Sequence, residues 1–181
     1  MRRAVFLDRD GVINAAVVLD RKPYSPKNFA GVKILDGVIE AIKSLMAQNF
    51  TPVIITNQPD ITRKIITESD LISMHKIISK KTQIKHFYIC PHDEKDLCEC
   101  RKPKPGLITQ AAKELQIDLN SSFLVGDRWR DIAAAQALNI ECFFIDYSYA
   151  EKQPSKPYTR VSSLLEVSKI LAERSRDDFT Y

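Results

Sequence analysis

Two carboxylates stand directly after an apolar run near the start of the chain. The run Ala4–Leu7 is followed by Asp8, Arg9, Asp10 and Gly11. Four apolar residues ending in an acidic turn predict a buried strand whose carboxyl end carries Asp8 and Asp10, where open α/β sheets bind their ligands. Two carboxylates separated by one residue suit phosphoryl transfer, because one attacks phosphorus while the other protonates the leaving oxygen and later activates water.

This chemistry requires a cation. A carboxylate nucleophile repels a phosphate dianion, so the interpretation needs a bound metal such as Mg²⁺ and further acidic ligands downstream. Taken alone, Asp-Arg-Asp-Gly is better explained as a polar turn after a strand, because such turns are common. The rest of the chain decides between the two.

Three later segments supply the missing groups, each after a strand-like run. Thr56 and Asn57 offer a hydroxyl and an amide that hold phosphate oxygens without adding charge. Arg101 and Lys102 offer cations that neutralise the phosphate and the nucleophile. Asp127 supplies a metal-ligating carboxylate. Their order and placement together favour the catalytic interpretation.

A second group of residues has the composition of a metal site. Cys90, His92, Cys98 and Cys100 fall within eleven residues. Three thiolates and an imidazole complete a tetrahedral set with no open position, which predicts a structural Zn²⁺. The alternatives are a coincidence among loop cysteines, which His92 argues against, and a redox site, which needs a Cys-x-x-Cys motif that is absent. The zinc is expected to fix residues 90–100 so that the following basic residues point inward.

Apolar runs alternate with helical patterns along the chain, which predicts an α/β fold with a doubly wound, mainly parallel sheet. Strands are expected at 4–7, 52–56, 87–89, 123–125, 142–145 and near 161, and helices at 37–49, 67–81, 105–116, 132–138 and 163–174. We expect residues 14–36 to form a long functional loop. Residues 1–174 are expected to form a single domain, followed by a frayed tail at 175–181.

The composition limits the partners. The chain has 181 residues, 44% hydrophobic residues and a net charge of +4. This mild basicity suits a small anionic substrate, and its basic residues are spread rather than grouped, which argues against nucleic acid. No apolar run approaches the roughly 20 residues of a membrane span, and no signal-peptide segment precedes the first strand. We therefore expect a cytoplasmic, monomeric protein that acts on a small phosphorylated metabolite.

Together these motifs resemble those of the haloacid-dehalogenase superfamily of phosphatases: Asp-x-Asp-Gly, a Ser or Thr, a Lys and Gly-Asp-x-x-x-Asp, which occur here in that order. The resemblance implies a Rossmann-like sheet in which the first and fourth strands are neighbours. It implies that Asp8 is the nucleophile and that Asp10 is the general acid and base, whose backbone carbonyl also binds Mg²⁺. It also implies that Thr56 holds the phosphate, Lys102 neutralises charge and Asp127 binds the metal.

The segment with the predicted zinc ligands, residues 90–100 (the zinc loop), indicates a particular branch of this superfamily. With the segment Cys-Arg-Lys-Pro-Lys-Pro-Gly at 100–106, it is similar to a small branch without a cap domain that contains heptose bisphosphate and histidinol-phosphate phosphatases. Too little chain separates the motifs for a cap, so the loops at 14–36 and 58–66 and the zinc loop are expected to grip the substrate. Pro59-Asp60 and Lys64 depart from the Ser-Gly and Gly expected of the heptose enzymes, which bears on the sugar rather than on the reaction.

The favoured function is a Mg²⁺-dependent phosphomonoesterase that forms an aspartyl phosphate and acts on a heptose bisphosphate. Asn57, Arg63, Arg101 and Arg128 are the predicted substrate-binding residues, and Asp131 is expected to orient Lys102 or the metal shell. A histidinol-phosphate phosphatase is the alternative, kept open by Asp60. A signalling receiver is disfavoured because its acceptor Asp follows the third strand. A non-catalytic protein that binds partners through the zinc loop is the remaining possibility.

Other conspicuous residues have simpler interpretations. His75 is expected on the surface or rim of a helix, and His86 as a cap or solvent contact. Cys142 is expected to be a buried small hydrophobic residue. Trp129 is expected to pack at a helix entrance, and the basic run 76–85 to be a solvated helix face.

Overall fold

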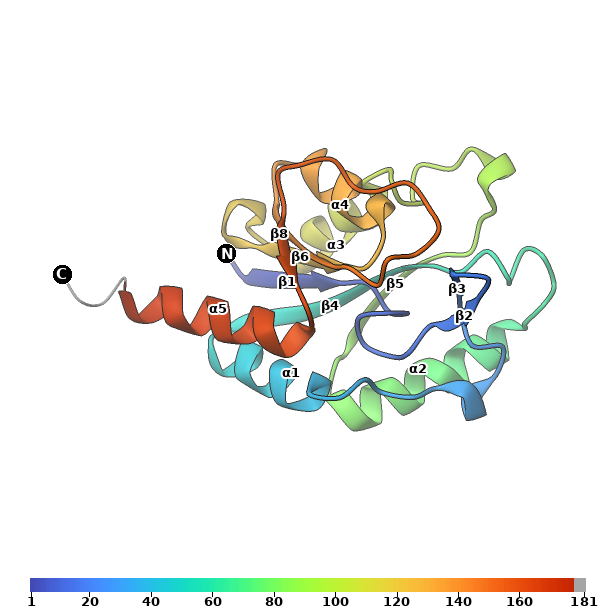
Figure 1. Cartoon of the computed structure of the whole chain (residues 1–181), viewed down its shortest axis with the longest axis horizontal. Coiled ribbons are helices and arrows are strands. Elements are labelled where there is room, and N and C mark those ends of the chain that lie inside the picture. The colour runs from blue at the N-terminus through green and yellow to red at the C-terminus, as the bar shows by residue number, and fades with distance from the viewer. Residues whose placement is uncertain (178–181) are drawn as a thin grey trace.

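The computed structural model describes residues 1–177 and contains a six-stranded parallel sheet with helices on both faces (Figure 1). The strands are β1 (Arg3–Leu7), β4 (Phe50–Asn57), β5 (His86–Cys90), β6 (Phe123–Gly126), β7 (Glu141–Ile145) and β8 (Thr159–Val161). Their order in the sheet is β5-β4-β1-β6-β7-β8. The predicted doubly wound parallel sheet is confirmed, and β1 lies between β4 and β6 at the point where the strand order reverses.

The sheet is buried on both faces. Val5 and Leu7 of β1 pack into one core, and Ala4 and Phe6 pack into the other. Figure 1 shows α1 (Val38–Ala47), α2 (Glu68–Thr82) and α5 (Leu164–Asp177) below the sheet, and α3 (Gly106–Leu115) and α4 (Trp129–Gln136) above it. Burial on both faces explains why the strands appear in the sequence as continuous apolar runs rather than as alternating patterns.

Local capping signals determine where two helices begin. The Thr67 hydroxyl accepts a hydrogen bond from the Asp70 amide at 3.1 Å, and the Asp70 carboxylate accepts one from the Thr67 amide at 2.9 Å, which starts α2 as predicted. Helix α4 begins at Trp129, three residues before the expected start at 132. The reason is that the Asp131 carboxylate accepts a hydrogen bond from the Arg128 amide at 3.0 Å, so the chain turns into a helix directly after Asp127.

The expected loop at 14–36 contains regular structure. Strands β2 (Val17–Leu19) and β3 (Lys22–Tyr24) form an antiparallel hairpin, followed by a short 3-10 turn at Phe29–Gly31. Three-residue strands, one of them containing Pro23, are too short to give a periodic pattern, which is why the sequence did not reveal them. Within residues 1–177, this hairpin and the loop after β5 are the insertions beside the carboxyl ends of the strands, and no separate cap domain accompanies them.

Helix α5 runs to Asp177, beyond the expected end at 174. The rest of the expected tail, residues 178–181, lies outside the described residues. Among the helices that the structure describes, none combines the length and the apolar character that a membrane crossing requires.

Candidate active site

Neighbouring strands bring together acidic residues that are far apart in the sequence. Leu7 of β1 is in register with Val125 of β6, so the residues that follow these strands meet at the same edge of the sheet. Carboxylate oxygens of Asp8, Asp127 and Asp131 lie within 4.8 Å of one another. The sequence therefore placed Asp8 and Asp127 correctly on one site.

Gly11 allows this close approach. Its φ of +91° lies in a region that residues with a side chain rarely adopt, and a Cβ at this position would lie 1.9 Å from Asp127 Oδ2. Any larger residue would push Asp127 away from the turn that carries Asp8. The glycine of the Asp-x-Asp-Gly motif is thus required by both the backbone conformation and the space available.

Lys102 is buried among the acidic residues. Its Nζ lies 2.9 Å from Asp8 Oδ1 and 2.6 Å from Asp131 Oδ1, and it donates a hydrogen bond to the Ile55 carbonyl at 2.8 Å. Burial alone would lower the pKa of this lysine, but the two carboxylates outweigh it and raise the pKa. Lys102 is therefore a fixed cation beside Asp8, and Asp131 makes the contact with it that the sequence predicted.

Asn57 anchors Lys102 through its backbone. The Asn57 side-chain oxygen accepts a hydrogen bond from the Lys102 amide at 3.1 Å, and the Asn57 side-chain nitrogen donates one to the Lys102 carbonyl at 3.0 Å. Thr56, buried at the end of β4, accepts a hydrogen bond from the Gln58 side chain at 2.8 Å. Both amide atoms of Asn57 thus already have partners, and its role in binding substrate stays a prediction.

The Asp10 carboxylate lies apart from the acidic cluster and is surrounded by hydrogen-bond donors. Arg9 contacts it through Nε at 3.1 Å and through Nη2 at 2.8 Å. Further hydrogen bonds come from Asn14 at 2.9 Å, Ser25 at 2.7 Å and Gln58 at 3.0 Å. Burial would raise the pKa of Asp10, but the charge of Arg9 and these hydrogen bonds together lower it.

Sequence reasoning missed these four partners of Asp10. Arg9 lies between Asp8 and Asp10, and Gln58 follows Asn57. Their positions beside motif residues could have indicated that they belong to the site. Asn14 and Ser25 belong to the region whose hairpin was not anticipated, and no pattern in the sequence marks them.

The acidic cluster fits a hard divalent cation. Both Asp127 carboxylate oxygens are buried and have no hydrogen bond of ordinary geometry among the described residues. The Tyr149 hydroxyl faces Asp127 and only partly offsets the rise in its pKa. Burial together with the neighbouring Asp8 and Asp131 raises the pKa of Asp127 well above its ordinary value. Burial, opposed by Lys102, raises the pKa of Asp8 to about 6. A buried carboxylate such as Asp127, with further carboxylates close by that raise its pKa, offers the oxygen ligands that Mg²⁺ takes.

This electrostatic arrangement predicts that Mg²⁺ stabilises the fold in a pH-dependent way. With its pKa raised from 3.8 to about 6, Asp8 binds its proton more tightly in the folded state than in the unfolded state. In the metal-free protein its contribution to stability is full below about pH 4 and declines as the pH rises to about 6. Since Mg²⁺ competes with that proton, the increase in Tm on adding Mg²⁺ should be larger at about pH 7 than at about pH 5.

Calorimetry with and without Mg²⁺ at the two pH values provides the measurement. Asp127→Asn is the control variant, because it removes one carboxylate of the cluster and should remove most of the increase in Tm. Equal increases in Tm at both pH values would contradict the assignment of this cluster as a Mg²⁺ site.

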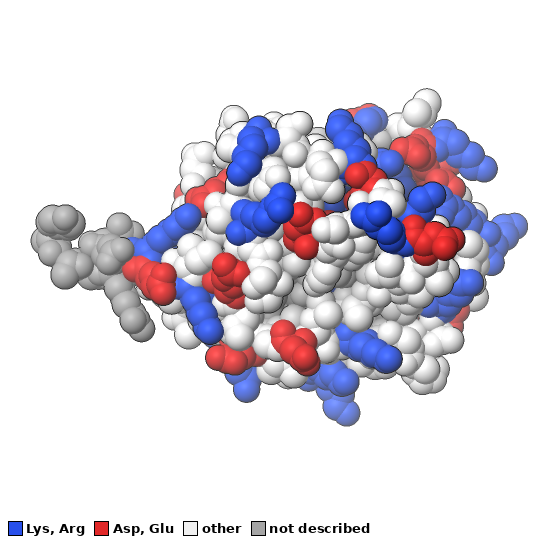
Figure 2. Space-filling view, in the orientation of Figure 1, with Lys and Arg blue, Asp and Glu red and all other residues white. Residues whose placement is uncertain are grey.

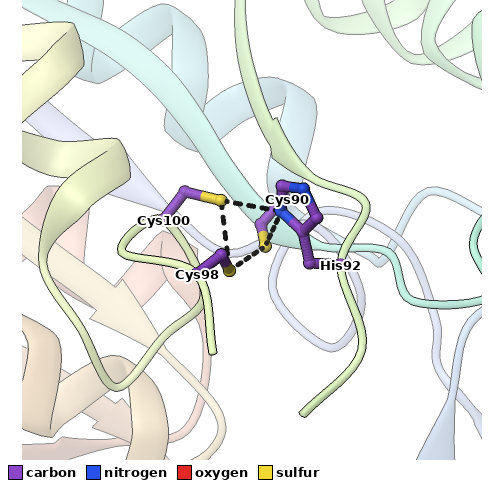
Figure 3. Close-up of side chains that lie close together, drawn as sticks. All are labelled: Cys90, His92, Cys98 and Cys100. Atoms are coloured by element: carbon purple, nitrogen blue, oxygen red, sulfur yellow. Dashed lines mark hydrogen bonds between the residues drawn. The ribbon is translucent and has the colours of Figure 1, made fainter. Parts of the chain in front are cut away.

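The Cys and His residues form a compact tetrahedron after β5 (Figure 3). Cys90 Sγ lies 3.7 Å from His92 Nδ1 and 3.6 Å from Cys98 Sγ. Cys100 Sγ lies 3.2 Å from His92 Nδ1 and 3.5 Å from Cys98 Sγ. Bond lengths of about 2.3 Å for Zn–S and about 2.0 Å for Zn–N give ligand separations of about 3.5–3.8 Å in a tetrahedron, so the four side chains fit this ion.

This loop is tied to the sheet and leads directly to Lys102. Cys90 pairs with Asn57 of the neighbouring strand β4, and its carbonyl accepts a hydrogen bond from the Gln58 amide at 2.7 Å. Arg101 donates a hydrogen bond to the His92 carbonyl at 3.0 Å, which closes the loop on itself. The loop that carries the four Cys and His side chains thus leads, through contacts to the sheet and to itself, into the segment that carries the buried lysine.

The predicted arginines line a cleft of about 360 Å³ beside the carboxylates. Two of them already have acidic partners: Arg63 contacts Asp93 at 2.7 Å, and Arg128 forms an ion pair with Glu151. Arg101 differs, because its Nε is buried and has no partner among the described residues.

Sequence reasoning missed two basic residues of the cleft, Lys22 and Arg130. Arg130 lines it and contacts the exposed Glu94 at 2.8 Å. The cleft lies at the carboxyl ends of the strands, which point toward the right-hand end of the molecule in Figure 1, and Figure 2 shows Lys and Arg side chains at that end.

The expectation for His75 was wrong. Its side chain is buried, because it lies on the face of α2 that packs against the sheet, where its ring stacks on Phe87. Cys142 is buried as predicted, and His86 is half-buried at the start of β5. Trp129 is the first residue of α4, as expected for a residue at a helix entrance.

Comparisons with known proteins agree with this geometry. A family model described as haloacid dehalogenase-like hydrolase matches residues 16–145. The D-glycero-beta-D-manno-heptose-1,7-bisphosphate 7-phosphatase of Yersinia pestis is 37% identical over 149 residues, which cover 76% of this chain and 76% of that protein. The D-glycero-alpha-D-manno-heptose-1,7-bisphosphate 7-phosphatase of Campylobacter jejuni is 33% identical over 178 residues, which cover 95% of this chain and 97% of that protein.

A solved structure is similar over almost the whole chain. It is the D,D-heptose 1,7-bisphosphate phosphatase from B. bronchiseptica, complexed with magnesium and phosphate. It superposes with a TM-score of 0.82 at 25% identity, covering 95% of this chain and 99% of that chain. The family model and the relatives each cover well over half of the sequence. This chain belongs to the haloacid dehalogenase-like hydrolase family.

Proposed function

We propose that this protein is a Mg²⁺-dependent phosphomonoesterase that uses Asp8 as its nucleophile. The observation that carries the proposal is the buried cluster of Asp8, Asp127 and Asp131 around Lys102, in which the Asp127 oxygens have no hydrogen bond of ordinary geometry among the described residues. Asp8, Asp127 and the Asp10 carbonyl would hold Mg²⁺, which when bound reduces the repulsion between the nucleophile and the phosphate.

In the first step an Asp8 carboxylate oxygen forms a bond to phosphorus as the bond between phosphorus and the leaving oxygen breaks. Asp10 gives a proton to that oxygen, so the product leaves as an alcohol. The phosphate dianion brings a like charge close to Asp10, which favours the protonated form that this step needs. Lys102 and Thr56 hold the charge and an oxygen of the transferring group.

In the second step a water molecule attacks phosphorus of the aspartyl phosphate. Asp10 accepts the proton of that water, the bond from phosphorus to Asp8 breaks, and inorganic phosphate leaves with the Asp8 carboxylate restored. Hydrogen bonds that favour the ionised form of Asp10 suit this step, because the residue then acts as a base.

We propose a heptose 1,7-bisphosphate as the substrate, hydrolysed at the 7-phosphate. Relatives with this activity support the choice. The cleft also supports it, because its lining has five basic side chains and three acidic ones, which leaves cationic groups for a second phosphate. Arg101 is one of these groups, since it lines the cleft and its Nε has no partner among the described residues.

Histidinol phosphate fits the cleft less well. Its amine is a cation and would need an unpaired carboxylate in the part of the cleft that would hold the heptose sugar. Asp60 contacts Arg63 at 3.5 Å, and Glu94 and Glu151 contact Arg130 and Arg128. Each acidic side chain of the cleft thus already faces an arginine.

The test is kcat/KM for the heptose bisphosphate, histidinol phosphate, a hexose monophosphate and an aryl phosphate. The heptose bisphosphate should be the best substrate, and Arg101→Gln should lower its kcat/KM about tenfold or more while affecting the aryl phosphate much less. Lys43→Gln, on the exposed face of α1, is the matched control. Faster hydrolysis of histidinol phosphate or of a monophosphate would refute the heptose assignment and leave the mechanism standing.

We also propose that Cys90, His92, Cys98 and Cys100 bind one structural Zn²⁺. Protein purified without chelator should contain about one zinc per chain by elemental analysis. Cys98→Ser should lose the metal and most activity, because the segment leading to Lys102 is no longer held. Cys142→Ser is the control, since Cys142 lies outside the cluster. Zinc-free protein with full activity would contradict this role. The expected monomeric state and cytoplasmic location stay predictions.

A further inference from the structure

His75 is a buried histidine that takes part in no step of the mechanism above. It lies on α2, and its ring stacks on Phe87 of β5 with 4.7 Å between ring centroids and 23° between planes. Its Nε2 lies 3.2 Å from Nη1 of Arg9. The stacking on one side and the guanidinium at the ring edge hold this imidazole in one orientation.

Arg9 connects His75 to Asp10. Only 1% of Arg9 is exposed, which is unusual for an arginine. Its Nη1 faces His75, while Nε and Nη2 contact the two oxygens of Asp10 at 3.1 and 2.8 Å. Because the guanidinium is planar and rigid, a partner at one edge determines how the other edge meets the carboxylate.

The chemistry of the contact identifies which partner accepts. Arginine carries only donors, so His75 Nε2 must be the acceptor and the imidazole must be neutral, with its proton on Nδ1. Burial and the charge of Arg9 lower the pKa of His75 to about 4, although the charge of Asp10 acts in the opposite direction. The neutral form that this hydrogen bond needs is therefore the form present near neutral pH.

We propose that His75 is a positioning residue for Asp10, acting through Arg9. The acceptor on His75 fixes the guanidinium, and the guanidinium fixes the carboxylate that transfers the proton to the leaving oxygen. Without this acceptor, Arg9 has a buried donor with no partner and rotates to find one. Asp10 then keeps its contacts with Asn14, Ser25 and Gln58 but loses the guanidinium that pairs with both of its oxygens. The proposal rests on the proposed function, since it assigns Asp10 the acid role.

The test uses the dependence of the rate on the leaving group. A sugar phosphate needs a proton on its leaving oxygen, whereas 2,4-dinitrophenyl phosphate does not. His75→Leu should lower kcat/KM for the sugar phosphate about tenfold or more and change that for dinitrophenyl phosphate by less than about threefold. His75→Gln, whose amide oxygen can accept from Arg9, should recover most of the loss. His86→Leu, at the start of β5, is the matched control: this histidine has no contact with Arg9, and the variant should behave like the wild type.

A second measurement does not depend on turnover. Hydrogen exchange of the Arg9 Nε–H, followed by NMR, should be faster in His75→Leu and close to wild type in His75→Gln. Equal losses on the two substrates, no loss, or unchanged Arg9 exchange in His75→Leu would each overturn the proposal. Wild-type protein that hydrolyses neither substrate would instead refute the proposed function, and the exchange measurement would still decide the role of His75.

Discussion

Substituting Asp8→Asn should lower kcat by about 10⁴-fold or more, the scale on which removal of a nucleophile acts in covalent catalysis. The amide is almost the same size as the carboxylate but does not attack phosphorus. The fold should stay intact, because Asp8 is a buried carboxylate beside Asp127 and Asp131 and its neutral replacement reduces their mutual repulsion. Phosphate release by the purified variant is the measurement.

Calorimetry of the same preparation separates lost chemistry from lost structure. The Tm of Asp8→Asn should equal or exceed that of the wild type in the absence of Mg²⁺. Asp20→Asn, in the turn of the exposed hairpin, is the matched control and should keep wild-type activity. Phosphate release by Asp8→Asn at the wild-type rate would exclude Asp8 as the nucleophile.

Lys102→Met should damage both stability and catalysis. Removing this cation leaves Asp8 and Asp131 buried without their counter-charge, and breaking a buried ion pair costs about 3–5 kcal/mol of the free energy of unfolding. The lost stabilisation of the transferring phosphate should lower kcat about 10²–10³-fold. Denaturant unfolding and steady-state kinetics measure the two effects.

Two further variants show whether the buried charges are the cause. Lys104→Met breaks an exposed ion pair with Glu99 and should cost less than about 1 kcal/mol. The double variant Lys102→Met/Asp131→Asn should recover part of the lost stability, because it removes one uncompensated carboxylate. If Lys102→Met is no less stable than Lys104→Met, the buried charge network does not have the role assigned to it.

The sequence could predict the sheet and the residues at its strand ends because both depend on local patterns. Runs such as Ala4–Leu7 are buried on both faces, and parallel strands place the residues that follow them at one edge. That rule places Asp8 and Asp127 at the same edge, and the neighbouring positions of their strands came from the strand order that the family resemblance implies. The tetrahedron of Cys and His side chains follows from ligand type and spacing.

Features that depend on contacts between distant segments could not be predicted in the same way. His75 appeared to be a surface residue because a helical pattern does not say which polar residue faces a buried charge, and Arg9 is 66 positions away. Arg128 appeared available to substrate because Glu151, its partner, lies 23 positions further on in a loop. Short strands such as Lys22–Tyr24 form only through their partner, so Ser25 and its contact with Asp10 had no sequence signal.

In the proposed mechanism, phosphate passes through a covalent bond to Asp8. A trapping experiment mixes the Asp10→Asn variant with 2,4-dinitrophenyl phosphate and Mg²⁺, then quenches with acid and reduces with borohydride. This substrate needs no proton on its leaving oxygen, so the intermediate still forms, and loss of the base slows its hydrolysis. An aspartyl phosphate is reduced to homoserine, which peptide mass spectrometry locates. The account predicts homoserine in place of Asp8 only when substrate is present. A modified residue elsewhere, or unmodified Asp8 in enzyme that is turning over, would contradict it.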